Sequence, residues 1–100
     1  MTNIRFLTLA ETEVDDAVSW YQEHSENESL HFLDELNRAV SVVSTYPLIA
    51  AEIGPGIRSF LFHSFPYSLI YGIDEDAIVV IAVAHQNREP RYWADRVPDS

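Results

Sequence analysis

The sequence has no cysteine and no lysine, and none of its apolar runs approaches the roughly 20 residues that a membrane-spanning helix requires. Without cysteine, disulfide bridges and cysteine-ligated metal ions are excluded. The N-terminal segment lacks the small-residue cleavage site of a signal peptide. From these absences we expect one soluble, cytoplasmic domain of 100 residues with no membrane partner.

The absence of lysine leaves arginine as the only strongly basic residue. Sixteen acids against six arginines give a net charge of -10, and no arginine lies between Phe6 and Asn37. A tight non-specific nucleic-acid binder makes about 6–10 phosphate contacts through lysine and arginine. We therefore do not expect free nucleic acid as a partner. The arginines are Arg5, Arg38, Arg58, Arg88, Arg91 and Arg96.

Metal and cofactor sites are not predicted either. The four histidines show no paired spacing with acids that would suggest a ligand set. The glycine-containing segment Gly54-Pro55-Gly56 is typical of a turn rather than of a phosphate-binding loop. We expect neither a metal ion nor a cofactor.

Hydrophobic periodicity predicts a strand at residues 3–9 and then a helix. Thr8 and Glu11 have the spacing of a capping box, which indicates the helix start. Apolar residues recur at spacings of three and four, as on one face of a helix. This first predicted stripe consists of Ala10, Val14, Ala17, Val18 and Tyr21.

A second helix is predicted to begin near Glu26. Ser25 and Glu28 repeat the capping pattern, and Pro47 ends the helix. The very short connection between the two helices indicates an antiparallel hairpin. The second predicted stripe consists of Leu30, Leu33, Leu36 or Asn37, Val40 and Val43, widened by Phe32 and Ala39.

Three strands are predicted at 57–63, 67–73 and 77–84, after a turn cluster that contains Gly54 and Gly56. The separators between the strands are too short for parallel crossovers, so neighbouring strands must be antiparallel. The fold class is therefore α+β, an antiparallel sheet with the helical hairpin on one face and the order β-α-α-β-β-β. The opposite face needs a cover, which residues 86–100, a second copy or a partner chain can provide.

Four stretches in order along the chain carry a family resemblance: AVSWYQEHS, FLDELNRAVSVVSTYP, GIRSFLFHSFPYSLIYGI and VVIAVAHQNREPRYWADR. On these stretches, which span nearly the whole chain, it resembles the RelE/ParE superfamily of toxins from type II toxin–antitoxin pairs and looks closer to ParE. The resemblance implies the fold predicted above and a small cytoplasmic toxin neutralised by a cognate antitoxin. RelE-like members cut messenger RNA on the ribosome, whereas ParE-like members interfere with DNA gyrase.

A RelE-like ribosome-dependent endoribonuclease would need an acid, a base and a cation near the phosphate. The candidate catalytic residues are Arg58, His85, Arg88 and Tyr92. Each also has a purely structural interpretation: His85 as a hydrogen-bonded core residue, Arg58 as a partner of an acid such as Glu52, and Tyr92 as a packing residue. Ribosome-dependent members tend to be rich in lysine and arginine, and this chain is not.

A ParE-like gyrase inhibitor would need a docking surface instead of catalytic residues. Buried aromatic residues and arginines dominate such interfaces. The candidate partner-binding residues are Arg88, Arg91, Tyr92, Trp93 and Arg96. The family often shows a pair of basic residues where this chain has Asn87–Arg88. A third alternative is an inactive or solitary family member that keeps only antitoxin binding.

The cognate antitoxin is the first expected partner, and DNA gyrase is the second. Because antitoxin segments are usually acidic and this chain is acidic too, we expect apolar anchors rather than charge attraction to hold the complex. A homodimer through the same surface is a further alternative.

Overall fold

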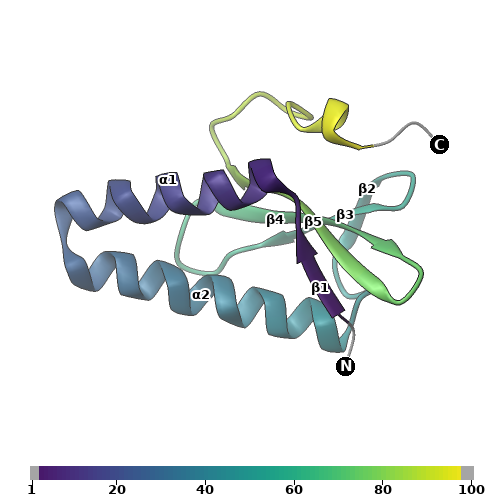
Figure 1. Cartoon of the computed structure of the whole chain (residues 1–100), viewed down its shortest axis with the longest axis horizontal. Coiled ribbons are helices and arrows are strands. Elements are labelled where there is room, and N and C mark those ends of the chain that lie inside the picture. Colours follow the sequence, from purple (N-terminus) through teal and green to yellow (C-terminus); the bar gives the residue numbers. More distant parts are fainter. Residues whose placement is uncertain (1–2, 98–100) are drawn as a thin grey trace.

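The computed structural model describes residues 3–97, which form two helices and a five-stranded sheet (Figure 1). The chain begins with strand β1 and then forms the helical hairpin. The four remaining strands and a short 3-10 helix, η1, follow. The elements are β1 Asn3–Phe6, α1 Thr8–His24, α2 Glu26–Thr45, β2 Ala51–Gly54, β3 Ile57–Leu61, β4 Tyr67–Asp74, β5 Ala77–His85 and η1 Ala94–Arg96.

The strand order in the sheet is β1-β5-β4-β3-β2, so the longest strand, β5, lies inside the sheet. Strands β2 to β5 pair antiparallel in sequence order, as the short separators predict. Strand β1 runs parallel to β5 and forms the edge of the sheet opposite to β2. The α+β fold with its hairpin on one face is confirmed, and the sheet is mixed rather than wholly antiparallel.

Strand β2 was not predicted. The residues Ala51–Gly54 pair with β3 in a hairpin, and Gly56 at its turn has φ 74°. This left-handed conformation is one that glycine adopts without strain. The strand is only four residues long, and three of its four residues are exposed. A short edge strand of this kind offers too few residues for a periodic pattern to reveal it.

The helix boundaries differ from the prediction in one respect. Helix α1 begins at Thr8 with Leu7 as its N-cap residue, so Thr8 does not cap it. The backbone N–H of Leu7 instead continues the β1–β5 ladder by donating to the carbonyl of Val80 at 3.0 Å. Helix α2 begins at Glu26 as predicted, although the side chain of Ser25 makes no capping hydrogen bond.

The buried face of α1 is the predicted stripe, and that of α2 keeps Phe32, Leu36, Ala39 and Val43 of the predicted stripe but not Leu30. Leu30 is 51% exposed, and the buried positions are Ser29, Phe32, Leu36, Ala39, Val43 and Ser44. Phe32 determines this orientation, because its ring packs within 6 Å of the rings of Tyr21, Phe62, Phe65 and Tyr67. An aromatic group of this size buries more apolar surface than Leu30 would.

Two apolar clusters lie on opposite faces of the sheet. The helix-side cluster fills the space between the hairpin and the sheet, with Phe32, Leu69, Tyr71 and Val80 at its centre. The tail-side cluster consists of Ile57, Ile70, Ile81, Ala82 and Trp93. Trp93 comes from the segment after β5, so the C-terminal residues cover the second face, one of the three covers expected. Residues 98–100 of the predicted cover lie outside the described part of the chain.

Candidate docking surface on the C-terminal segment

The residues that follow β5, here called the tail (86–97), cross the second face of the sheet as a series of turns (Figure 1). The first turn is held where the N–H of Gln86 donates to the carbonyl of Pro66 at 2.8 Å. Later N–H groups donate to carbonyls three residues earlier, including those of Glu89, Arg91 and Trp93. The tail therefore has a defined backbone path without a strand neighbour.

Trp93 fixes the centre of the tail. Its side chain is only 3% exposed and packs in the tail-side cluster. A bulge in β5 prepares this position, because Ile70 pairs with Ala82 while Tyr71 pairs with Val80. The extra residue makes two consecutive side chains, Ile81 and Ala82, face the tail. Burial of Trp93 makes it a packing residue of the free chain rather than an accessible contact residue.

Glu13 on α1 fixes the end of the tail. Its Oε1 accepts hydrogen bonds from the backbone N–H of Val83 at 3.0 Å and from Nη1 of Arg96 at 2.9 Å. Its Oε2 accepts from the Tyr92 hydroxyl at 2.5 Å and from Nη2 of Arg96 at 3.1 Å. The Arg96 Nη1 also donates to the carbonyl of Ile81 at 3.2 Å. The Glu13 and Arg96 side chains are 13% and 12% exposed, so this pair is shielded from water.

These contacts raise the pKa values of two tail side chains, Tyr92 and Arg96. Burial, reinforced by the hydrogen bond to Glu13, raises the pKa of the Tyr92 phenol well above its ordinary value near 10. The hydrogen bonds to Glu13 likewise raise the pKa of the Arg96 guanidinium. Tyr92 therefore stays protonated at neutral pH and is a poor proton donor to a substrate.

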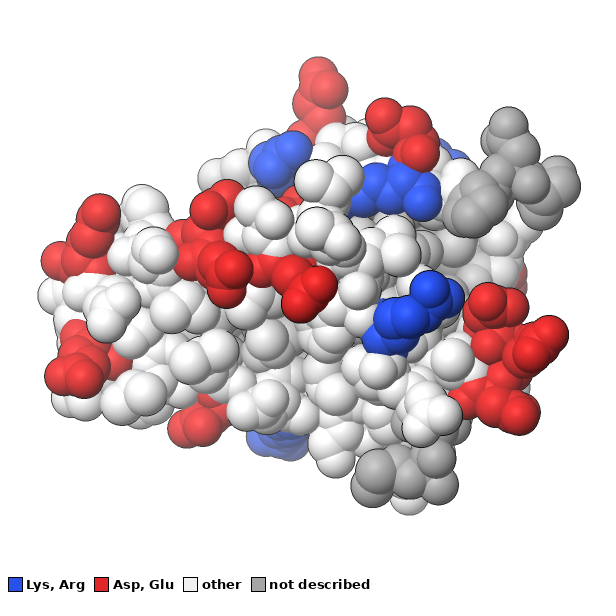
Figure 2. All heavy atoms as spheres, in the orientation of Figure 1, with Lys and Arg blue, Asp and Glu red and all other residues white. Residues whose placement is uncertain are grey.

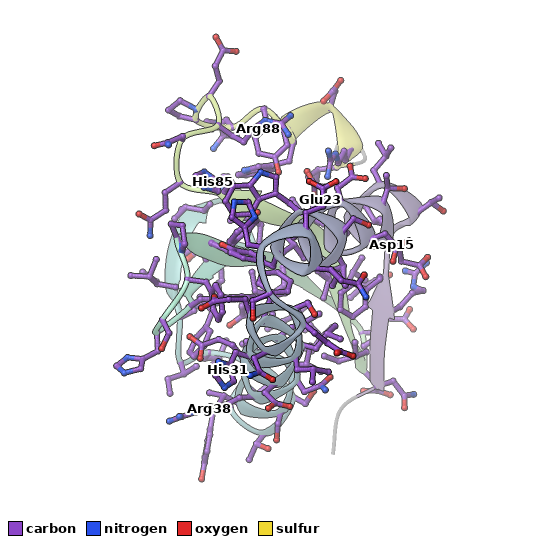
Figure 3. The ribbon with its side chains drawn as sticks, turned by 90° about the vertical axis from the view of Figure 1, so that its left-hand side faces the viewer. Asp15, Glu23, His31, Arg38, His85 and Arg88 are labelled. Atoms are coloured by element: carbon purple, nitrogen blue, oxygen red, sulfur yellow. The ribbon has the colours of Figure 1, made fainter. Side chains whose placement is uncertain are left out.

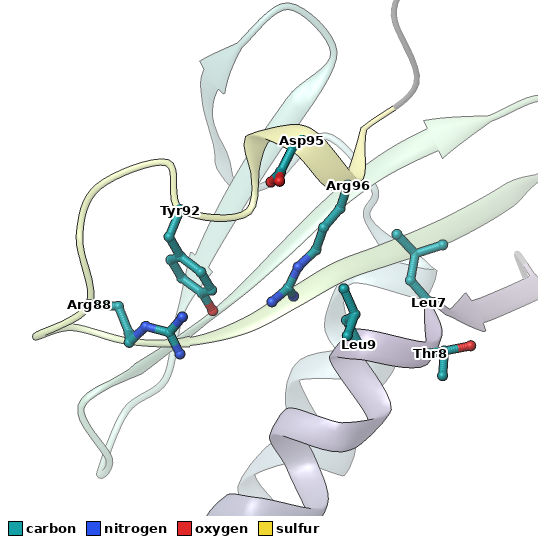
Figure 4. Close-up of a pocket in the computed structure, with 7 residues that line it drawn as sticks. All are labelled: Leu7, Thr8, Leu9, Arg88, Tyr92, Asp95 and Arg96. Carbon is teal, nitrogen blue, oxygen red and sulfur yellow. The ribbon is translucent and has the colours of Figure 1, made fainter.

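Arg88 and Arg91 differ from Arg96 because both are exposed. The guanidinium carbon of Arg88 lies 3.9 Å from the centre of the Tyr92 ring, and that of Arg96 lies 5.1 Å from it. Figure 4 shows the Tyr92 ring between these two side chains, beside a hollow of about 470 Å³ next to the start of α1. The guanidinium of Arg88 thus has a defined position while remaining open to solvent.

Arg91 lies over the β2 edge of the sheet. Its guanidinium carbon is 5.2 Å from the centre of the Trp93 ring, and its Nη1 donates to the carbonyl of Ile53 at 3.4 Å. A Cβ at Gly54 would meet this Nη1 at 3.1 Å, so the glycine allows the close approach. The backbone of Arg91 has φ 62°, a left-handed conformation unusual for a non-glycine residue.

Of the four nuclease candidates, His85, Arg88 and Tyr92 line one hollow beside the tail, whereas Arg58 lies apart from them. Arg58 points to the helix side of β3, opposite to the tail, because Phe60 two positions on packs in the helix-side cluster. Its Nη1 donates to the carbonyls of Ala50 at 2.6 Å and Leu48 at 3.3 Å. The expected pairing with Glu52 is not the one seen.

The acid that was expected to pair with Arg58 has another role. Oε2 of Glu52 accepts the N–H of Gly56 at 2.7 Å in the β2–β3 turn. Arg58 thus anchors the connection between α2 and β2 through its bonds to carbonyls. It has the structural role that was the alternative to catalysis, although its partners are carbonyl oxygens rather than an acid.

His85 lies at the end of β5, near Arg88, as Figure 3 shows. Its Nδ1 accepts the N–H of Asn87 at 3.0 Å, and its ring packs edge-on against Tyr67 at 5.0 Å. His85 and Tyr67 line a groove of about 570 Å³ between α1 and the end of β5, together with the exposed Trp20. The half-buried histidine is thus a packing and turn-forming residue.

The surface is mainly acidic, as the net charge of -10 predicts. Figure 2 shows acidic side chains spread over the visible face, with single arginines between them. Arg5 lies 3.9 Å from Asp74 in an exposed ion pair. In the part of the chain from residue 3 to 97, no three acids or histidines come together as a metal site, and neither helix is long and apolar enough to cross a membrane.

Glu13 is the residue that sequence reasoning missed. Its position was informative, because it lies three residues after Ala10 and four before Ala17, both buried. An acid on the buried side of a helix requires partners, and arginines near the C-terminus were the available cations.

Comparison with known proteins identifies the family. The family model of the ParE toxin of type II toxin–antitoxin systems, parDE, matches residues 4–90. This chain belongs to the ParE toxin family. The matched region ends at Pro90, so Arg91 and the Glu13 partners Tyr92 and Arg96 lie beyond it.

A solved structure supports the fold of this ParE-family toxin. A chain of the chromosomal ParDE toxin–antitoxin system from P. aeruginosa superposes with a TM-score of 0.73 at 15% sequence identity. The match covers 85% of this chain and 96% of that chain. No curated protein matches this sequence. The predicted RelE/ParE resemblance, closer to ParE, is therefore confirmed.

Proposed function

We propose that this ParE-family toxin inhibits DNA gyrase by binding it through Arg88 and Arg91, and that a cognate antitoxin neutralises it. The observation that supports this most is the arrangement of the tail. Two exposed arginines are held in defined positions by residues that are themselves buried or hydrogen-bonded. Arginines fixed before binding lose little side-chain entropy in a complex, which favours affinity.

The five candidate partner-binding residues then divide into two groups. Arg88 and Arg91 contact the target, whereas Tyr92, Trp93 and Arg96 hold the tail on the sheet. The nuclease alternative has less support, because Arg58 faces the helix side and Tyr92 is a poor proton donor. The proposed target lies in the cytoplasm, where the toxin acts.

Neutralisation by the antitoxin depends on apolar contacts in this proposal. Large apolar side chains are exposed around the connection between α2 and β2, including Tyr46 at 62% and Leu48 at 69%. Side chains of this kind provide binding energy without opposite charge. The acidic surface of this chain gives an acidic antitoxin segment no long-range attraction.

Induced expression in a bacterial host tests the proposed target. We expect growth arrest, loss of negative supercoiling in a reporter plasmid and intact messenger RNA. Either Arg88→Ala or Arg91→Ala alone should restore growth. Truncating a central interface arginine typically costs about 2 kcal/mol or more of binding energy, so the variant should bind gyrase too weakly to inhibit it.

Arg38→Ala is the matched control for this test. Arg38 is an exposed arginine on α2, and Figure 3 shows it at the opposite end of the molecule from Arg88. Its substitution should leave toxicity unchanged. Messenger RNA cut at codons would favour the endoribonuclease instead, and normal growth with the unsubstituted chain would identify an inactive family member.

A further inference from the structure

The edge of β5 is incomplete where Glu13 contacts it. Strand β1 pairs only with Ala77–Val80 and ends at Phe6, so among the described residues no strand pairs with Ile81–His85 on that side. Backbone groups of a buried strand need hydrogen-bond partners. A gap of this kind leaves the N–H of Val83 and the carbonyl of Ile81 to be satisfied by side chains.

Glu13 and Arg96 together fill this gap. The carboxylate of Glu13 accepts the N–H of Val83, and the guanidinium of Arg96 donates to the carbonyl of Ile81. The two side chains also pair with each other through two hydrogen bonds, of 2.9 and 3.1 Å. A bidentate, shielded pair of this kind is geometrically specific. The end of the tail is therefore joined to the sheet edge and to α1 at one place.

The position of Arg88 depends on the same carboxylate. Glu13 accepts the Tyr92 hydroxyl, and the Tyr92 ring is the surface on which the Arg88 guanidinium lies at 3.9 Å. The hydrogen bonds of Glu13 go to Val83, Tyr92 and Arg96, and to neither Arg88 nor Arg91. Glu13 can influence binding only indirectly, by holding Tyr92, on which Arg88 lies, and Arg96, near the end of the tail.

We propose that Glu13 is a positioning residue, whose carboxylate fixes the tail through Val83, Tyr92 and Arg96 so that Arg88 and Arg91 are held ready for the target. The inference rests on the proposed docking function of those two arginines. Without the carboxylate, the tail separates from the sheet edge and the arginines lose their fixed arrangement. The fold of the helices and the antiparallel strands remains.

The two tryptophans make the tail observable. Trp93 is 3% exposed, whereas Trp20 is 54% exposed, so a Trp20→Phe background leaves one buried reporter on the tail. In that background we expect Glu13→Gln to increase acrylamide quenching of Trp93 fluorescence. The substitution removes the charge from the carboxylate that accepts the hydrogen bonds of the tail, so the population with an opened tail should rise about tenfold or more. Asp15→Asn, a neutralised acid at an exposed position of the same helix, should change nothing.

Arg96→Gln breaks the same contact from the tail side and should give the same quenching. Trp93 that stays protected in both variants would overturn the proposal. Loss of the whole far-UV circular dichroism signal in Glu13→Gln would also overturn it, because Glu13 would then be needed for the fold itself. A chain with an opened tail that inhibits gyrase as well as the parent would contradict the positioning role.

A double-mutant cycle on gyrase inhibition separates positioning from general destabilisation. We expect Glu13→Gln to weaken inhibition about tenfold, and Arg88→Ala to add little in that variant, because the arginine has already lost its position. Full additivity would contradict the proposal. If the parent chain does not inhibit gyrase at all, the proposed function fails, while the Trp93 measurement still decides whether Glu13 holds the tail.

Discussion

Tyr92 shows how one side chain connects the two parts of the docking surface. Its hydroxyl donates to Glu13, and its ring lies between the guanidinium groups of Arg88 and Arg96. In the structure Tyr92 and Trp93 both pack against the rest of the chain, and their part in docking stays a prediction. The four hydrogen bonds of Glu13 could not be predicted, because they join residues 70 to 83 positions apart.

The raised pKa of Tyr92 predicts how its contribution to stability depends on pH. The folded-state pKa lies above the unfolded value of about 10, so the folded state keeps its proton longer than the unfolded chain does. The stabilisation is fully present below about pH 10 and is lost as the pH rises above that value. Tyr92→Phe should lower the free energy of unfolding by about 1.5–3 kcal/mol at pH 7. The difference from the parent should shrink above pH 10.

Urea denaturation at a series of pH values measures this difference. Tyr46→Phe serves as the control, because the Tyr46 side chain is 62% exposed. The other buried tyrosines are present in both the parent and the Tyr92→Phe variant, so their effect on the free energy of unfolding cancels in the difference. A difference for Tyr92→Phe that stays constant up to pH 11 would show that its phenol titrates alike in both states, against the structure.

At the scale of elements, the predicted buried stripe of α2 was wrong at Leu30 and right at Phe32, Leu36, Ala39 and Val43. The predicted stripe placed both Leu30 and Phe32 inside, and of these two only Phe32 lies in the interior. The sequence contains both residues at helical spacings, so periodicity alone cannot decide which of the two is buried. Contacts with aromatic residues of β4 and the β3–β4 connection decide between them, and these are not visible in the helix sequence.

A pair of leucine substitutions on α2 tests the orientation. Leu36 is 6% exposed and Leu30 is 51% exposed. Leu36→Ala should lower the free energy of unfolding by about 2–5 kcal/mol because it leaves a cavity in the core. Leu30→Ala should change it by about 0.5 kcal/mol or less, as expected for an exposed site. Equal losses in chemical denaturation would place Leu30 in the core and contradict its observed exposure.

At the scale of the whole molecule, the order of elements was enough to predict the fold. Short separators force β3, β4 and β5 to be antiparallel, and a short helix connection forces a hairpin. The parallel pairing of β1 with β5 could not be obtained in this way, because it depends on how the hairpin returns the chain to the sheet. The sequence left three possible covers for the second face of the sheet. In the described residues the tail covers it, because Trp93 is buried there.

The net charge of -10 leads to a prediction for the antitoxin complex. If apolar anchors hold it, the dissociation constant should change by less than about threefold between about 50 and 200 mM salt. Isothermal titration calorimetry with the purified pair should also give a negative heat-capacity change. A steep loss of affinity with salt would show that ion pairs dominate the interface.

Purified DNA gyrase decides whether the tail is a docking surface. Surface plasmon resonance should give a measurable dissociation constant for the parent chain. The Arg88→Ala, Arg91→Ala double variant should bind roughly 30-fold or more weakly, and Arg38→Ala should bind like the parent. Equal binding by the parent and the folded double variant would contradict the role given to the two exposed arginines.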